Sequence, residues 1–181
     1  MKKFVKLFAC VLVVAFVINA SNIAKPLTQK KVVNPNNILM RDEIEWVQNA
    51  TVNGITFSQN EDGSWHVYGT STQSFGIDLT FTPFQLEEGK TYMLSSGMKH
   101  DGMKTYRLFL NDTVSGMHYM GDLKPHSSNI ASNNTFGAFT SSASAKYQVT
   151  FFVAYAGAVI DEVLCPCLVE GAEPGNFYIY K

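Results

Sequence analysis

Asn53-Gly-Ile-Thr-Phe-Ser-Gln-Asn-Glu-Asp-Gly-Ser-Trp-His-Val-Tyr-Gly-Thr70 has the pattern of one complete β-hairpin and decides the fold of this chain. Apolar and polar residues alternate on both sides of Asn60-Glu-Asp-Gly63, which is the period of two half-buried strands. The Asp-Gly pair suits a tight turn, because glycine has no Cβ to clash at positive φ and aspartate tolerates the left-handed region. The predicted inward residues are Ile55, Phe57, Trp65 and Val67, and the predicted outward pair is His66 and Tyr68.

Short alternating runs of the same kind continue along the chain from Asp42 onward. They predict roughly nine short strands separated by turn residues, and no segment has a convincing helical period. This pattern is typical of an antiparallel β-sandwich or barrel, so we expect an all-β fold. Besides the hairpin, the expected strands cover residues 44–46, 75–81, 91–95, 104–110, 117–120, 135–139, 146–155 and 159–168.

The first residues of the chain have the features of an export signal. A lysine-containing start precedes the apolar run Leu7–Ile18, which is shorter than the ~20 residues that a membrane-spanning helix needs. We expect residues 1–24 to be a signal peptide, with cleavage after Ala20 or Ala24, or else an uncleaved N-terminal membrane anchor helix. Either way, the protein is expected to be extracellular or at the cell surface.

Composition divides the rest of the chain. Residues 25–41 contain Pro26 and Pro35 and lack sustained periodicity, so they are interpreted as a linker, and residues 42–181 are predicted to form a single domain. Residues 1–41 contain seven of the fourteen basic residues and no acidic residue, whereas residues 42–181 contain seven basic and all fifteen acidic residues. A body this acidic, with no basic stripe, argues against nucleic acid as a partner. A membrane is expected as a partner only through the N-terminal segment, if that segment is uncleaved.

Two cysteines, Cys165 and Cys167, remain if the signal is removed. They flank Pro166 and point to the same face of an extended strand, where a disulfide between them would be strained. An exported protein offers the oxidising conditions for such a bond, but we interpret both residues as small buried hydrophobes. The histidines have no metal-ligand spacing, so a zinc site is not expected.

Three segments follow a pattern known from other proteins: residues 53–70, Leu86-Glu-Glu-Gly-Lys-Thr-Tyr-Met-Leu-Ser95, and Asp161-Glu-Val-Leu-Cys-Pro-Cys-Leu-Val-Glu-Gly171. Together they resemble the carbohydrate-binding, galactose-binding-like jelly-roll modules of bacterial extracellular proteins and phage tail proteins. The resemblance spans about residues 42 to 175, and it implies a jelly-roll β-sandwich that binds glycans. The chain differs from the family pattern at His66 and Tyr68, so specificity is to be sought there first.

Sugar binding needs flat apolar faces on which a pyranose ring stacks, beside polar side chains that bond the hydroxyl groups. The candidate ligand-binding residues are His66, Tyr68, Arg107, Phe109, Tyr119 and Trp46. Alternation places Arg107 and Phe109 on the same, outward face of their strand. Each candidate also has a plain interpretation as a packed sheet residue. The set gains weight if the strands of His66 and Arg107 belong to one sheet.

The turn residues Asn60 and Asp62 offer oxygen ligands of the kind that calcium takes, so a structural calcium ion there is a hypothesis. The turn by itself explains the same residues. No other cofactor is expected. Catalysis is not expected either, because nothing pairs two carboxylates across a cleft as glycosidases require, and no Gly-x-Ser-x-Gly motif is present.

The first functional hypothesis is therefore an exported, non-catalytic β-sandwich that binds a polysaccharide or other glycan. The alternative is a structural or adhesive module of a surface assembly or a phage virion, in which the domain supplies a rigid shape and makes protein contacts. An export signal favours the first hypothesis, because virion proteins assemble in the cytoplasm.

Overall fold

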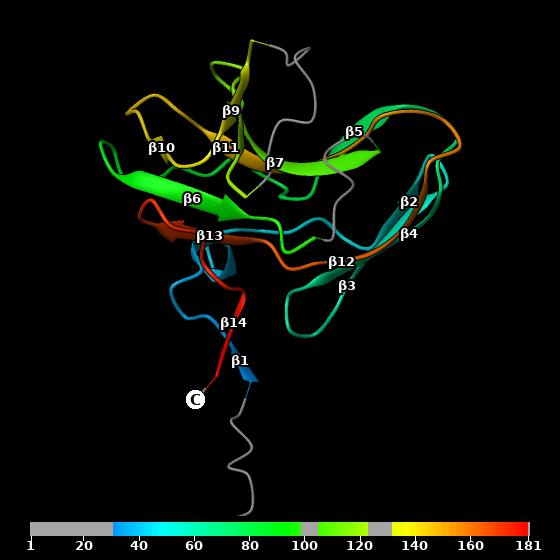
Figure 1. Cartoon of the computed structure of the whole chain (residues 1–181), viewed down its shortest axis with the longest axis horizontal. Helices are drawn as coiled ribbons and strands as arrows, with labels where there is room; N and C mark the ends of the chain where they lie inside the picture. The colour runs from blue at the N-terminus through cyan, green and yellow to red at the C-terminus, as the bar shows by residue number, and fades with distance from the viewer. Residues whose placement is uncertain (1–30, 99–104, 123–131, 181) are drawn as a thin grey trace, which may run out of the picture. The chain divides into compact units, whose positions relative to one another are not determined.

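The computed structural model describes residues 31–98, 105–122 and 132–180, which are drawn in colour in Figure 1. The predicted signal or anchor segment, residues 1–24, lies outside the described residues, as do residues 25–30 of the predicted linker. Within the described ranges, no helix has the length and apolar character needed to cross a membrane. One compact unit covers Lys31–Ile179.

Strands form nearly all the regular structure of this unit, so the all-β prediction is confirmed. The elements are β1 Lys31–Val33, the 3-10 turn η1 Ile38–Met40, β2 Ala50–Val52, β3 Ile55–Gln59, β4 Trp65–Thr70, β5 Phe75–Asp78, β6 Thr91–Ser95, β7 Tyr106–Asp112, β8 His118–Met120, β9 Asn134–Phe136, β10 Phe139–Thr140, β11 Tyr147–Val153, β12 Val159–Leu164, β13 Cys167–Glu170 and β14 Tyr178–Tyr180. The sheets have the orders β1-β14, β10-β6-β13, β5-β11-β7-β8-β9 and β12-β4-β3-β2. Pairing is antiparallel except between β8 and β9 in the described registers.

The hairpin predicted from residues 53–70 is present as β3 and β4, with Phe57 opposite Val67. Its four predicted inward residues have no exposed surface, so their placement in the core is confirmed. The turn differs in detail from the expectation. Gly63 has a φ of 82°, but Asp62 keeps a negative φ and instead accepts a hydrogen bond from the Ser64 amide at 3.0 Å. The Asp62 side chain thus stabilises the turn by accepting this hydrogen bond.

A second hairpin precedes the predicted one. Asn53 and Gly54 have φ angles of 49° and 82°, the positive pair of a type I′ turn, and they join β2 to β3. The Asn-Gly dipeptide at the start of the quoted stretch is the sequence signal for this turn. The strand expected over residues 44–46 is wrong, because Trp46 makes only an isolated bridge with Thr80.

The folded unit begins before position 42, which was the predicted boundary between linker and domain. β1 pairs with β14, and η1 buries two of its residues in the core. Asn37 explains this arrangement. Its Oδ1 accepts hydrogen bonds from the amides of Leu39 (3.1 Å) and Leu168 (3.0 Å), and its Nδ2 donates to the Pro166 carbonyl (2.9 Å). Residues 31–41 are therefore part of the fold, where the sequence predicted a linker.

The strand expected over residues 159–168 is in fact two strands, because the chain changes sheets at Pro166. β12 pairs with β4, whereas β13 pairs with β6. Figure 1 shows the chain passing from orange β12 to β13 in this way. Proline has no amide hydrogen to donate to a ladder, so the crossover falls where pairing is interrupted anyway. Cys167 is fully buried and Cys165 half-buried, both as free thiols.

Side chains of different sheets meet in one continuous core, as in a β-sandwich. Phe57 of β3 lies edge-on to Phe151 of β11, with ring centroids 5.6 Å apart. Tyr106 of β7 stacks on the same Phe151 ring at 5.9 Å, and its hydroxyl donates to the Glu162 carboxylate of β12 at 2.5 Å. The four-stranded and five-stranded sheets are thereby held face to face by aromatic packing.

The close approach of the two hairpins gives a test of this fold. A Cβ added at Gly69, whose φ is 131°, would lie 2.2 Å from the Gly54 carbonyl oxygen. We expect Gly69→Ala to lower the free energy of unfolding by about 2–4 kcal/mol, from backbone strain and the clash together. The matched control is Gly89→Ala, because Gly89 also has a positive φ of 73° but nothing within 4 Å. Its cost should be about 1 kcal/mol. Urea unfolding checks both variants, and equal losses would contradict the clash.

Candidate functional site

The predicted ligand-binding residues do not form one surface. His66 and Tyr68 lie in β4 of the β12-β4-β3-β2 sheet, whereas Arg107 and Phe109 lie in β7 of the β5-β11-β7-β8-β9 sheet. The condition under which the four would support one another, a shared sheet, is therefore not met. Most of the candidates instead lie on two separate surfaces, one on β4 and one on β7, and beside a hollow at Trp46.

The first surface is the outward face of β4 and its neighbours. The rings of His66 and Tyr68 lie 4.6 Å apart at an angle of 33°, and Tyr68 is 41% exposed. The His66 Nε2 is 2.7 Å from the Asp161 Oδ1 of β12. Thr56 of β3 is directly opposite Tyr68. The face thus combines an exposed aromatic ring with a carboxylate and hydroxyl groups, and Asp161 is a member that the sequence analysis missed.

The second surface surrounds Arg107 on β7. Its guanidinium carbon lies 4.4 Å from the Phe152 ring centroid and 5.8 Å from that of Phe109. Phe109 itself is only 4% exposed, and its ring packs against His118 at 4.3 Å. Phe109 was expected to present an outward platform, and its burial corrects that expectation. The half-buried Phe152, directly across the ladder from Arg107, takes the place beside the cation.

Burial also sets the electrostatics of this second surface. It lowers the pKa of the Arg107 guanidinium, because the charged form loses hydration. Burial, together with the nearby Arg107 charge, lowers the pKa of His118, although the Asn134 hydrogen bond opposes the shift. His118 Nδ1 and Asn134 Oδ1 are 3.2 Å apart. A cation and hydrogen-bonding side chains are thus held beside aromatic rings in a partly desolvated site.

The hollow lies beside Trp46, another predicted residue. It has a volume of about 640 Å³ and is lined by Glu45, Trp46, Val47, Gln48 and Phe81. The Trp46 indole packs on Trp65 at 5.7 Å and donates its Nε1 hydrogen to the Leu39 carbonyl at 3.2 Å. Internal contacts therefore hold the position and orientation of this ring. Backbone hydrogen bonds from Phe81 to Glu45 (2.7 Å) and from Val47 to Leu79 (2.9 Å) keep the two lining segments side by side.

Phe81 is the residue of this hollow that sequence reasoning missed. Strict alternation over residues 75–81 would turn Phe81 to the same buried face as Leu79. The strand ends at Asp78, however, so the alternation stops there. Leu79 and Thr80 are then both buried, and Phe81 is 68% exposed. The following Pro83 was the signal that the ladder could not continue much further.

Tyr119 is placed away from all three of these surfaces. Its ring stacks on Phe139 at 4.1 Å and lies 6.2 Å from Tyr147. Burial raises the pKa of its hydroxyl, with a contribution from Tyr147. One face of the ring is therefore used for packing between sheets, which corresponds to the plain interpretation of this residue.

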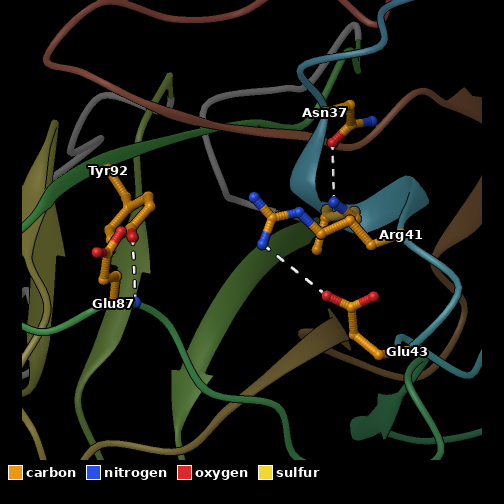
Figure 2. A network of polar contacts seen from close by, with 6 residues as sticks. Asn37, Arg41, Glu43, Glu87 and Tyr92 are labelled. Carbon is orange, nitrogen blue, oxygen red and sulfur yellow. Dashed lines mark hydrogen bonds and ion pairs between the residues drawn. The ribbon is translucent and has the colours of Figure 1, made fainter.

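A polar groove runs beside η1. Figure 2 shows the Arg41 guanidinium turned toward the Glu43 carboxylate, 3.9 Å away, and the Glu87 amide donating to the Tyr92 hydroxyl at 3.1 Å. It has a volume of about 420 Å³. The charged side chains that line it are Arg41, Glu87 and Glu170. Arg41 already has Glu43 as a carboxylate partner, and Glu170 has Lys90.

The predicted calcium ligands are used within the turn. Asp62 Oδ1 accepts from the Ser64 amide and hydroxyl, at 3.0 and 2.6 Å, and Oδ2 accepts from the Tyr178 hydroxyl. Asn60 donates to the Ser64 hydroxyl at 2.9 Å. Among the described residues, no three His, Cys, Asp or Glu side chains gather as metal ligands would. These contacts account for Asn60 and Asp62 as turn residues.

The Asp62–Tyr178 contact gives a pH-dependent prediction. Hydrogen bonds from Ser64 and then Tyr178 lower the pKa of Asp62 below 3.8, so its stabilisation is present above pH 3.8 and is lost as the pH falls. Burial, followed by the bond to Asp62, raises the pKa of Tyr178 from 10.0 to about 12. The contribution of Tyr178 to the free energy of unfolding is therefore fully present below pH 10.0 and is lost as the pH rises from 10.0 toward about 12.

We expect Tyr178→Phe to lower the free energy of unfolding at neutral pH by about 1 kcal/mol and to flatten both pH dependences. Urea unfolding across the pH range measures this. Tyr68→Phe is the control, since no hydrogen bond of its hydroxyl is present among the described contacts. Identical pH profiles for Tyr178→Phe and the unmodified protein would contradict the expectation.

Comparison with protein-family models, with curated proteins and with solved structures finds no match to this chain. The chemistry and geometry of the described side chains are therefore what a functional proposal has to rest on.

Proposed function

We propose that the protein is a non-catalytic glycan-binding module, and that it binds through the hollow formed by Trp46 and Phe81. The observation that carries the proposal is an aromatic ring left 68% exposed at the edge of a hollow of sugar size. Ligand pockets are lined mainly by apolar and aromatic side chains together with a few polar groups. Ligand pockets for small molecules commonly have volumes of about 300–1,000 Å³.

The lining of the hollow suits a pyranose ring. Phe81 and Trp46 offer apolar faces for the C–H side of a sugar, and Trp46 is held in place by its bond to Leu39 and by Trp65. Glu45 and Gln48, which line the same hollow, supply a carboxylate and an amide for hydroxyl groups. His66 and Tyr68, with Asp161, form a second proposed contact surface of the same chemistry.

The finer fold and the location of the protein belong to the same proposal. The jelly-roll topology is supported by the resemblance of residues 53–70, 86–95 and 161–171 to carbohydrate-binding modules, and the coarser sandwich-like packing agrees with it. Export to the cell surface or beyond is supported by the apolar run Leu7–Ile18 after a basic start. In that location polysaccharides are the partner to expect.

Substitution at Phe81 tests the binding proposal. The full chain is titrated with a panel of neutral and acidic polysaccharides, and Phe81→Ala is expected to lower the affinity about 10-fold or more, because a stacking face is lost. Its melting temperature should be unchanged, since the ring is mostly exposed. Tyr68→Ala tests the second surface in the same assay.

Val114→Ala is the matched control, because Val114 is an apolar residue of similar exposure, 59%, in the turn after β7 and outside both the hollow and the His66–Tyr68 surface. It should bind as the unmodified protein does. Absence of binding to any glycan of the panel would overturn the proposal. Binding that Phe81→Ala leaves intact would overturn only the assignment of the hollow.

One observation favours the alternative, a structural or adhesive module that makes protein contacts. β12 is an edge strand of its sheet, and its outward Val159 and Val163 are 73% and 50% exposed near the Tyr68 ring. Exposed apolar edge strands are contact surfaces for other chains. If this is the function, light scattering should show concentration-dependent assembly that Val163→Lys abolishes. A monomer at all concentrations would contradict self-assembly through this edge.

A further inference from the structure

Arg107 is a half-buried cation without a carboxylate partner among the described residues. None of the described acidic side chains forms an ion pair with it, and its Nε is buried with no hydrogen-bond acceptor. Its pKa is lowered by burial alone, with no neighbouring charge contributing. Removing a charged group from water costs several kcal/mol in principle, and proteins usually offset the cost with a partner. Among the described residues, no carboxylate offsets this cost for Arg107.

The other arginine of the chain shows the contrast. Arg41 is more exposed, yet it has the Glu43 carboxylate at 3.9 Å. Lys90, an exposed cation, likewise has Glu170 at 2.9 Å. Of these three described cations, the most buried one is thus the one without an ion-pair partner.

Two aromatic rings border the Arg107 guanidinium. Its central carbon lies 4.4 Å from the Phe152 ring centroid and 5.8 Å from that of Phe109, distances at which cation–π contact stabilises the charge. A guanidinium beside aromatic rings still has N–H groups along its edge. That edge is the geometry that binds a carboxylate through two parallel hydrogen bonds.

Neighbouring strands add side chains that bond neutral hydroxyl groups. Gln148, Asn111, His118 and Asn134 lie in one cross-strand row over β11, β7, β8 and β9. All four are half-buried. Amides and an imidazole in such a row can donate to and accept from the hydroxyl groups of a saccharide that lies across the sheet.

We propose that the surface around Arg107 on the β5-β11-β7-β8-β9 sheet binds an acidic polysaccharide, with Arg107 as the anchor for the carboxylate of a uronic-acid unit. Phe152 lies beside the cation, and the polar row bonds the hydroxyl groups of adjacent units. This inference rests on the proposed glycan binding and names its ligand class. The bound carboxylate supplies a counter-charge that none of the described acidic side chains gives.

The test compares polymers that differ only in charge. The full chain is titrated with polygalacturonate, alginate and hyaluronate, and with the same polymers after methyl esterification of their carboxylates. We expect at least one acidic polymer to bind, and its esterified form to bind about 10-fold or more weakly, because the ion-paired hydrogen bonds are lost. Added salt should weaken binding of the acidic form only.

Two variants assign the effect to Arg107. Arg107→Met keeps the apolar stem against Phe152 and removes the charge, so it should lower the affinity for the acidic polymer about 10- to 100-fold. Arg107→Lys keeps the charge but not the two-pronged edge and should fall between. Arg41→Met changes the net charge equally and is the matched control, with unchanged affinity expected.

Thermal unfolding separates a binding role from a structural one. Since no described carboxylate pairs with the guanidinium and methionine keeps the apolar packing on Phe152, Arg107→Met should melt at the same temperature as the unmodified protein or higher. A marked fall in melting temperature would show that the charge serves the fold and would overturn the inference. So would equal binding of acidic and esterified polymers, or full affinity in Arg107→Met.

The failure of this inference differs from that of the proposed function. If neutral polysaccharides bind and no acidic polymer binds more tightly than its esterified form, the ligand class is wrong and glycan binding stands. If nothing in either panel binds, both proposals fall together.

Discussion

The contact between Phe57 and Phe151 is the constraint on which the placement of every candidate residue depends. It joins the inward faces of two sheets, and Tyr106 and Glu162 continue the same junction. In a strand, successive side chains alternate between faces, so fixing Phe57 inward fixes its neighbours outward. A slip of one residue in either strand would exchange core and surface throughout that strand. The exposure of Tyr68 and the position of Arg107 are consequences of this packing.

Local pattern predicted the hairpin well and the pairing of distant strands poorly. The alternation of residues 55–67 and the Gly63 turn are encoded within a few residues, and the structure confirms them. Sheet membership is a long-range property, so nothing in the sequence placed β4 and β7 in separate sheets. Asn37 is a similar case: its partners lie 129 and 131 residues away along the chain. A single asparagine among polar residues carries no local sign of such bonds.

The candidate sites show the same division. Trp46 was identified by type, but the hollow beside it exists only because β5 ends at Asp78 and leaves Phe81 outside the sheet. Arg107 was identified from the alternation of its strand. That no described carboxylate pairs with it, and that Phe109 is buried, both depend on packing that periodicity does not describe. Residue type and hydrophobic period indicated which side chains to consider as candidates. Exposure and the pairing of charges decide what each side chain can do.

The pairing of β1 with β14 determines how the unit meets a pull on the chain before Lys31. Tension applied there first loads a two-stranded ribbon and the bond from the Asn34 amide to the Phe177 carbonyl at 2.8 Å. Behind it, Asn37 joins η1 to the start of β13 through two hydrogen bonds, to the Pro166 carbonyl and from the Leu168 amide. We expect the two-stranded β1-β14 sheet to separate before the larger sheets do. The hydrogen bonds of Asn37 then resist transfer of the force to the hydrophobic core.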